Sequence, residues 1–326
     1  MRTGFRSASS LVAVVLAVVG CGDWGTPPIP AGSPASLAVR VLVEPEAGAQ
    51  AVLDLMAAAR RSLWMEMYLL TDADAIAALA GRAAAGLDVR VILEPAPYGD
   101  ADGNQGAYAQ LAAAGVDVRW ATARFTYTHA KAFTVDHARL VVLTLNLTRD
   151  GLAGNREYVG VDDDPTDVAA AEAIFAADAV GASTGAPGGR LATSPESSRA
   201  TLAALIAGAR ASLTLETEEL TDGGIRDALL AARARGVEVT IAWPGPAGAV
   251  SAALAAAGAV LRVPSAPPIH GKVLVADDRT LYVGSANLSP TSLDDDREIG
   301  LLLAQPADAA GIGAVVTADA AAGTAP

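Results

Sequence analysis

The chain is poor in cysteine and in aromatic residues. Its 326 residues contain a single cysteine, Cys21, so no disulfide can form within the chain. Aromatic residues account for only 4% of the sequence although hydrophobic residues reach 52%, so the core must be built mainly from Ala, Val and Leu. A hydrophobic fraction of this size supports a large folded core and argues against disorder except at the ends of the chain.

Positive charge is also scarce. The chain has 23 Lys and Arg against 36 Asp and Glu, which gives a formal net charge of -13. An acidic surface repels phosphate backbones, so the composition argues against a general nucleic-acid-binding protein, although it leaves room for a small basic site. The sequence also has no glycine-rich phosphate loop, no G-x-S-x-G elbow and no zinc-ligand spacing.

The first residues resemble an export signal. Arg2 and Arg6 precede a short apolar run, residues 8–19, which is typical of a signal-peptide core. Small residues ahead of Cys21 resemble a bacterial lipobox, in which this cysteine would be lipidated; the alternative is a plain secretory signal with an incidental cysteine. We expect a signal peptide over residues 1–20, a Gly- and Pro-rich linker over residues 21–37, and an extracytoplasmic protein anchored to a membrane.

The rest of the chain contains an internal repeat. The segment ARRSLWMEMYLLTD, residues 59–72, returns as ARASLTLETEELTD, residues 209–222, at an offset of 150. Further along the chain the offset falls to 141, because the second copy is shorter. We therefore expect one half over residues 38–185 and a second half over residues 186–326.

Each copy alternates apolar strand patterns with Ala-rich helical patterns. Residues 63–68 and 88–93 predict strands, and residues 73–85 predict a helix that Gly86 closes. This alternation predicts an α/β fold of two similar halves, each a mixed, largely parallel sheet flanked by helices. The residues after Ala309 predict a weak helix and a frayed tail.

Both copies carry the same polar motif. In the first copy it consists of His129, Lys131, Asp136, Thr144 and Asn146, followed by Glu157. In the second copy it consists of His270, Lys272, Asp277, Ser285 and Asn287, followed by Glu298. The same spacing occurs twice at one offset, so coincidence is a poor explanation, whereas a lone histidine such as His137 is better explained as a satisfied polar residue.

These residue types suit phosphoryl chemistry. A histidine can attack phosphorus or donate a proton near neutral pH, and a lysine supplies a positive charge for a phosphate oxygen. An asparagine offers amide donors to another oxygen, and a carboxylate on the far imidazole nitrogen fixes the tautomer of the ring. One copy supplies half of this set, whereas two facing copies provide a nucleophile and an acid on opposite sides of phosphorus.

The duplicated motif resembles the HxKxxxxD…GSxN signature of the phospholipase D superfamily. The second copy matches in full, and the first departs at Leu143-Thr144, where the family often has Gly-Ser. The resemblance covers nearly the whole chain from about residue 38 to residue 303. It implies a sandwich of two α/β halves around one active site, a phosphohistidine intermediate, and no metal or other cofactor.

The resemblance also implies a role for each motif residue. His129 would be the nucleophile and His270 the acid and base, with each histidine oriented by Glu157 or Glu298 from the opposite half. Phosphate oxygens would be held by Lys131, Lys272, Asn146, Asn287, Thr144 and Ser285. Asp136 and Asp277 would be structural.

The leading hypothesis is a metal-independent phospholipase D-like hydrolase that releases phosphatidic acid and a headgroup from phospholipids. The membrane anchor and the acidic composition favour a lipid substrate over nucleic acid. An endonuclease, a cardiolipin synthase-like transferase and a non-catalytic phosphate- or lipid-binding lipoprotein remain as alternatives. A monomer is expected, because the duplication completes the site within one chain.

Several other acids lie close to the motifs. Glu66 and Glu216 align between the copies and either reach the site or are buried partners at strand ends. The runs of three aspartates at residues 162–164 and 294–296 resemble metal loops but lack His or Cys companions, so solvated turns explain them better.

Overall fold

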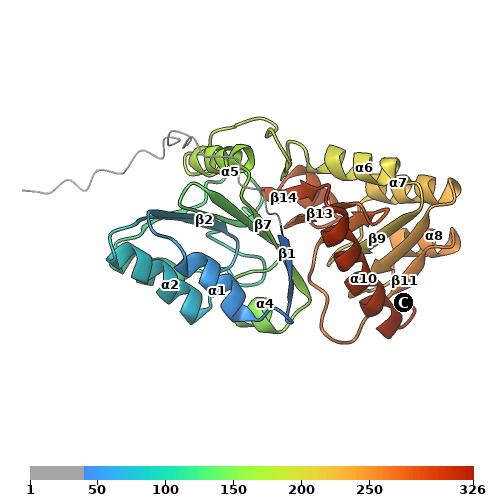
Figure 1. Cartoon of the computed structure of the whole chain (residues 1–326), viewed down its shortest axis with the longest axis horizontal. Helices are drawn as coiled ribbons and strands as arrows, with labels where there is room; N and C mark the ends of the chain where they lie inside the picture. Colours follow the sequence, from blue (N-terminus) through green and yellow to red (C-terminus); the bar gives the residue numbers. More distant parts are fainter. Residues whose placement is uncertain (1–39) are drawn as a thin grey trace, which may run out of the picture.

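The computed structural model describes residues 40–326, which form two α/β halves side by side (Figure 1). The signal peptide, Cys21 and the linker expected from the sequence lie outside the described residues. Each half contains one seven-stranded sheet, with the order β1-β7-β6-β5-β2-β3-β4 in the first and β11-β10-β9-β12-β13-β14-β8 in the second. The two-half architecture predicted from the repeat is therefore confirmed.

The two strands and the helix predicted for the first half are present as β2, β3 and α2. Its strands are β1 (Arg40–Glu44), β2 (Ser62–Met67), β3 (Asp88–Leu93), β4 (Asp117–Trp120), β5 (Lys131–Val135), β6 (Arg139–Leu143) and β7 (Glu157–Asp162). Its helices are α1 (Ala49–Ala57), α2 (Ala73–Ala84), α3 (Gln105–Ala113), α4 (Arg149–Ala153) and α5 (Pro165–Asp178).

The second half repeats this pattern. Its strands are β8 (Leu191–Ser194), β9 (Ser212–Glu216), β10 (Glu238–Ala242), β11 (Val260–Arg262), β12 (Val273–Ala276), β13 (Thr280–Gly284) and β14 (Glu298–Leu303). Its helices are α6 (Ser198–Gly208), α7 (Gly223–Ala234), α8 (Ala249–Ala256), α9 (Pro290–Asp294) and α10 (Pro306–Ala322). Among the helices of residues 40–326, none combines the length and apolar character needed to cross a membrane.

Both sheets are mixed, as predicted, but antiparallel pairs outnumber parallel ones. In the first sheet β2, β3 and β4 run parallel, whereas the pairs β2–β5, β5–β6, β6–β7 and β7–β1 are antiparallel. The expectation of a largely parallel sheet was therefore wrong. Short turns join β5 to β6 and β12 to β13, and a two-strand hairpin of that kind can only be antiparallel.

An aspartate of each repeat ties such a hairpin to the rest of its sheet. The carboxylate of Asp136 accepts hydrogen bonds from the backbone N–H groups of Arg60, Arg61 and Ser62, at 2.7–3.1 Å. Asp277 does the same with residues 210–212. These carboxylates anchor the turn after β5 or β12 to the start of β2 or β9, a position that fits the structural role expected for both aspartates.

A single apolar core joins the two halves. It contains side chains from the first sheet, among them Ala132, Val142 and Tyr158, and side chains from the second, among them Val283 and Leu301. Helices α5 and α10 contribute to the same core, and each half also has a separate core beneath its other helices. The halves therefore pack as one structural unit (Figure 1).

The C-terminal segment is a better-defined element than the sequence suggested. Helix α10 runs for 17 residues, and it buries Ile312 and Val316 between the halves. The expectation of a weak helix and frayed tail was wrong because the apolar positions of this helix are stabilised by tertiary packing rather than by intrinsic propensity.

The Leu143 departure from the family motif has a local explanation. Gly284, which stands at the equivalent position of the second half, lies against Tyr282: an added Cβ would come within 2.6 Å of the Tyr282 hydroxyl and of the Gly300 backbone. In the first half the residue equivalent to Tyr282 is Val141, and Leu143 is fully buried in the core. Only the half with the tyrosine therefore requires glycine at this position.

We predict that Gly284→Ala lowers the free energy of unfolding by about 1–3 kcal/mol, the usual cost of overpacking a filled core. The matched control is Gly311→Ala in α10, where an added Cβ meets open space and the stability should not fall. Chemical denaturation of both variants measures the difference. Equal stability of the two variants would contradict the proposed close contact.

Candidate active site

The two motif histidines lie in one cleft between the halves. The cleft has a volume of about 520 Å³, and its walls include His129 and Asn146 of the first half and His270 and Asn287 of the second. The predicted convergence of the two copies on a shared site is therefore seen in the structure. Other lining residues include Tyr68, Tyr127, Glu218, Glu219 and Asp296.

Each histidine precedes a central strand, and the lysine two residues later points back to it. Lys131 opens β5, and its ammonium group donates a 2.8 Å hydrogen bond to the His129 carbonyl. Lys272 lies just ahead of β12 and donates to the His270 carbonyl at 2.6 Å. Both lysine side chains are almost completely buried, so two ammonium groups lie beside the histidines and are largely shielded from water.

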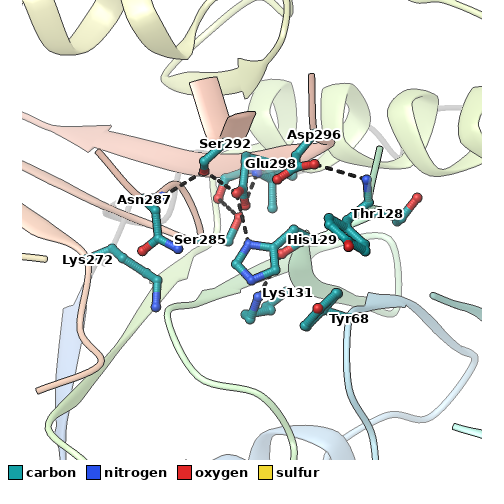
Figure 2. A network of polar contacts seen from close by, with 12 residues as sticks. Tyr68, Thr128, His129, Lys131, Lys272, Ser285, Asn287, Ser292, Asp296 and Glu298 are labelled. Carbon is teal, nitrogen blue, oxygen red and sulfur yellow. Dashed lines mark hydrogen bonds and ion pairs between the residues drawn. The ribbon is translucent and has the colours of Figure 1, made fainter. Parts of the chain in front are cut away.

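The histidines are held by carboxylates from the opposite half. Glu298, at the start of β14, lies 2.9 Å from Nδ1 of His129 (Figure 2). Glu157, at the start of β7, lies 2.6 Å from Nδ1 of His270. Both carboxylates are fully buried, and the crossed pairing follows the expectation from the sequence. Contact at Nδ1 leaves Nε2 of each ring as the nitrogen that can face a ligand.

Two arginines that the sequence analysis missed make this crossing possible. Each stands immediately before a motif glutamate, and its backbone N–H bonds to the segment that leads to the opposite histidine: Arg297 to the Tyr127 carbonyl at 2.9 Å, and Arg156 to the Pro268 carbonyl at 2.8 Å. Their guanidinium groups are buried in matching ion pairs, Arg297 with Asp178 and Glu196, and Arg156 with Asp319 and Glu46. Arg156 and Arg297 are 141 residues apart, the same offset as the motif residues, so the repeat in the sequence could have identified both.

The motif hydroxyls contact the carboxylates and the backbone. Thr144 donates a 2.5 Å hydrogen bond to Glu157, and the backbone N–H of Tyr158 donates to the Thr144 hydroxyl. The equivalent Ser285 hydroxyl lies against the backbone of Ile299. Thr144 and Ser285 are fully buried, and Glu157 and the strand backbone already engage their hydroxyls, so the expected direct contact with phosphate does not fit their position.

A third hydroxyl, also missed from the sequence, completes the support of Glu298. Ser292 hydrogen-bonds to the carboxylate of Glu298 and accepts a 2.8 Å hydrogen bond from the backbone N–H of Asn287 (Figure 2). This arrangement fixes the asparagine and the glutamate relative to each other. Both Asn146 and Asn287 line the cleft, where their amide groups are placed to donate to a bound anion.

The remaining histidine is structural. Nδ1 of His137 lies 2.8 Å from Glu172, and its ring packs edge-on against Trp64. The sequence interpretation of His137 as a satisfied polar residue is thus confirmed. Glu66 and Glu216 are also buried and do not line the cleft. Glu216 accepts a 2.8 Å hydrogen bond from the Tyr158 hydroxyl, which fits the interpretation of this glutamate as a buried partner.

Burial dominates the electrostatics of the first-half motif. It lowers the pKa of Lys131 to about 7 and raises the pKa of Glu298 to about 8. Burial, followed by the nearby charges of Lys131 and Lys272, holds the pKa of His129 well below its usual range. His129 is consequently neutral at physiological pH, as a nucleophile must be.

Two cleft residues near the histidines were not identified from the sequence. The ring of Tyr68 packs against His129, with 4.5 Å between centroids, and lies 4.8 Å from the Lys131 ammonium. The carboxylate of Glu218 lies 2.8 Å from the Lys272 ammonium and 3.3 Å from Nε2 of His270. They stand at equivalent positions of the repeat, so the 150-residue offset would have pointed to both.

Comparison with protein families agrees with this geometry. Residues 52–179 and 202–316, more than half of the chain, match the family described as cardiolipin synthase, PLD-like domain. The chain therefore belongs to this family, within the phospholipase D superfamily. A comparison with curated protein sequences found no match.

Solved structures share the fold. Phosphatidylserine synthase from Haemophilus influenzae Rd KW20 is similar with a TM-score of 0.67 at 12% identity, over 87% of this chain and 85% of that chain. Polyphosphate kinase from Porphyromonas gingivalis is similar with a TM-score of 0.67 at 15% identity, over 86% of this chain. This chain spans about half of that kinase. At these identities the likeness shows the fold alone.

The cluster of two lysines and two asparagines predicts a pH-dependent anion site. As the pH rises from 6 to 8.5, Lys131 loses its proton near pH 7 and Glu298 ionises near pH 8, so the affinity for sulfate should fall. Sulfate keeps its double charge throughout, which makes it a suitable probe in calorimetry. Lys131→Arg retains its charge and should reduce the fall; an unchanged pH dependence in this variant would contradict the role given to Lys131.

Proposed function

We propose that the protein is a phosphodiesterase of the phospholipase D type, which hydrolyses phospholipids to phosphatidic acid and a free headgroup. The crossed pairing of two histidines with two buried glutamates in one cleft is the observation that carries the proposal. It provides two oriented imidazoles beside two ammonium groups and two amides, and these groups suit a two-step displacement at phosphorus.

In the first step His129 acts as the nucleophile. Its Nε2 attacks phosphorus and forms an N–P bond, while the bond from phosphorus to the headgroup oxygen breaks and that oxygen takes a proton from His270. The Glu298 carboxyl group accepts a hydrogen bond from Nδ1–H of His129, and in its ionised form it stabilises the positive charge that develops on the ring. Lys131, Lys272, Asn146 and Asn287 hold the phosphoryl oxygens.

In the second step His270 acts as a base. It takes a proton from water, the water oxygen attacks phosphorus, and the N–P bond to His129 breaks. Glu157 orients His270 through Nδ1 as Glu298 orients His129. Thr144 and Ser292 act through the glutamates: Thr144 hydrogen-bonds to Glu157 and Ser292 to Glu298, and these bonds hold the two carboxylates in place.

A lipid substrate is supported by three observations. The matched family is described by a lipid-synthesising enzyme, one similar structure is a phosphatidylserine synthase, and the acidic chain disfavours polyanionic nucleic acid. We further propose that the protein is exported and anchored through Cys21 and that it acts as a monomer on the membrane that carries it.

We predict that the full-length protein forms phosphatidic acid from mixed phospholipid vesicles in EDTA, measured by mass spectrometry, because the two-histidine mechanism requires no metal. His129→Asn should lose at least about a thousandfold in rate, since the nucleophile is removed. Loss of the native activity in EDTA, with recovery on adding a divalent ion, would count against this mechanism. Adding glycerol would reveal phosphatidyl transfer, the activity favoured by the family description.

The assignment of the two histidines can be tested with a phosphatidyl ester of p-nitrophenol, a leaving group that needs no acid. His270→Asn should release a burst of about one p-nitrophenol per chain and then stall, because the N–P bond forms but water is not activated. His129→Asn should give no burst. A burst from His129→Asn and none from His270→Asn would exchange the two roles.

A further inference from the structure

The repeat is asymmetric at one position beside the catalytic residues. Tyr68 follows β2 in the first half, and Glu218 follows β9 at the equivalent position of the second half. Both residues line the cleft. The two halves therefore present different chemistry to a ligand at a point where their backbones correspond.

The tyrosine is engaged with its own half. Its hydroxyl accepts a 2.6 Å hydrogen bond from the backbone N–H of Tyr98, and its ring packs against His129 and Lys131. Tyr68 carries no negative charge, unlike the glutamate at the equivalent position of the second half. The Lys131 ammonium group donates its hydrogen bond to the His129 carbonyl. The first half thus offers its lysine to a ligand without a competing anion from Tyr68.

The glutamate instead makes the contacts that a phosphate oxygen would make. One carboxylate oxygen of Glu218 lies 2.8 Å from Nζ of Lys272 and 3.3 Å from Nε2 of His270. Nε2 is the ring nitrogen left for a ligand by the contact between Nδ1 and Glu157. The side chain of Glu218 is 36% exposed, so it can move away without disturbing the core.

Glu218 is ionised in this position. Its burial acts to raise the pKa, but the charges of Lys272 and His270 outweigh that effect and hold the pKa well below the usual range for a carboxyl group. A carboxylate in van der Waals reach of the phosphate position repels an incoming anion, and the repulsion grows with the charge of that anion.

We propose that Glu218 is a specificity-determining residue that competes with phosphate for Lys272 and His270. It weakens the binding of all phosphate groups and weakens dianions most, so the site favours singly charged diesters over monoesters and free phosphate. This inference deepens the proposed phosphodiesterase function by defining the charge of the group that the site takes, but it concerns binding and can be measured without turnover.

The test is the affinity of the full-length protein for inorganic phosphate and for dimethyl phosphate at pH 8, measured by calorimetry. Glu218→Gln should bind inorganic phosphate at least about tenfold more tightly, because one nearby negative charge is removed. The gain for singly charged dimethyl phosphate should be smaller. Glu218→Tyr, which copies the residue of the first half, should also tighten phosphate binding.

The matched control is Glu219→Gln, which removes the same charge from an exposed neighbour that lines the cleft without contacting Lys272. This variant should change phosphate affinity by less than about twofold. Unchanged or weaker phosphate binding in both Glu218 variants, with unfolding curves like the native one, would overturn the proposal. Tighter phosphate binding without any diesterase activity would support the role of Glu218 while removing the proposed function.

Discussion

The crossed contact between each histidine and a glutamate of the other half is the constraint on which the site depends. Glu298 and Glu157 are fully buried at the first positions of β14 and β7, and each contacts a hydroxyl of its own half and the histidine of the other half. An ionised carboxylate without a partner is costly in an apolar environment. The functional tautomer of His129 therefore requires the second half, and that of His270 requires the first.

The arginines Arg156 and Arg297 explain how this contact can be both buried and well positioned. Each is held by two acids, and each fixes through its backbone the strand end that carries a motif glutamate and the loop that leads to the opposite histidine. Asp319, on α10, and Asp178, on α5, supply one acid of each set. The two helices between the halves consequently connect the apolar core to the geometry of the cleft.

Spacing and residue type predicted the duplication, the α/β class and the motif residues, and the resemblance to the phospholipase D superfamily implied the crossed pairing. The sequence did not predict the antiparallel majority of strand pairs, since periodicity identifies strands but not their partners. It also placed the hydroxyls of Thr144 and Ser285 on the ligand, where the structure turns them toward Glu157 and a strand backbone. Which side of a strand end faces a cleft depends on packing between the halves, and a linear motif carries no such information.

The residues around His129 differ from those around His270, and these differences support different catalytic roles for the two histidines. His129 lies beside two lysines and the uncharged ring of Tyr68, surroundings that disfavour a positive ring and suit a neutral nucleophile. His270 has one lysine, Lys272, 3.3 Å from its ring and a carboxylate near each ring nitrogen, Glu157 at Nδ1 and Glu218 at Nε2, so its surroundings carry more negative charge than those of His129. Identical motifs placed in two such environments need not perform the same step. The proposed order, with His129 attacking first and His270 supplying the proton, thus gains support from the residues around the motifs, independently of the motifs themselves.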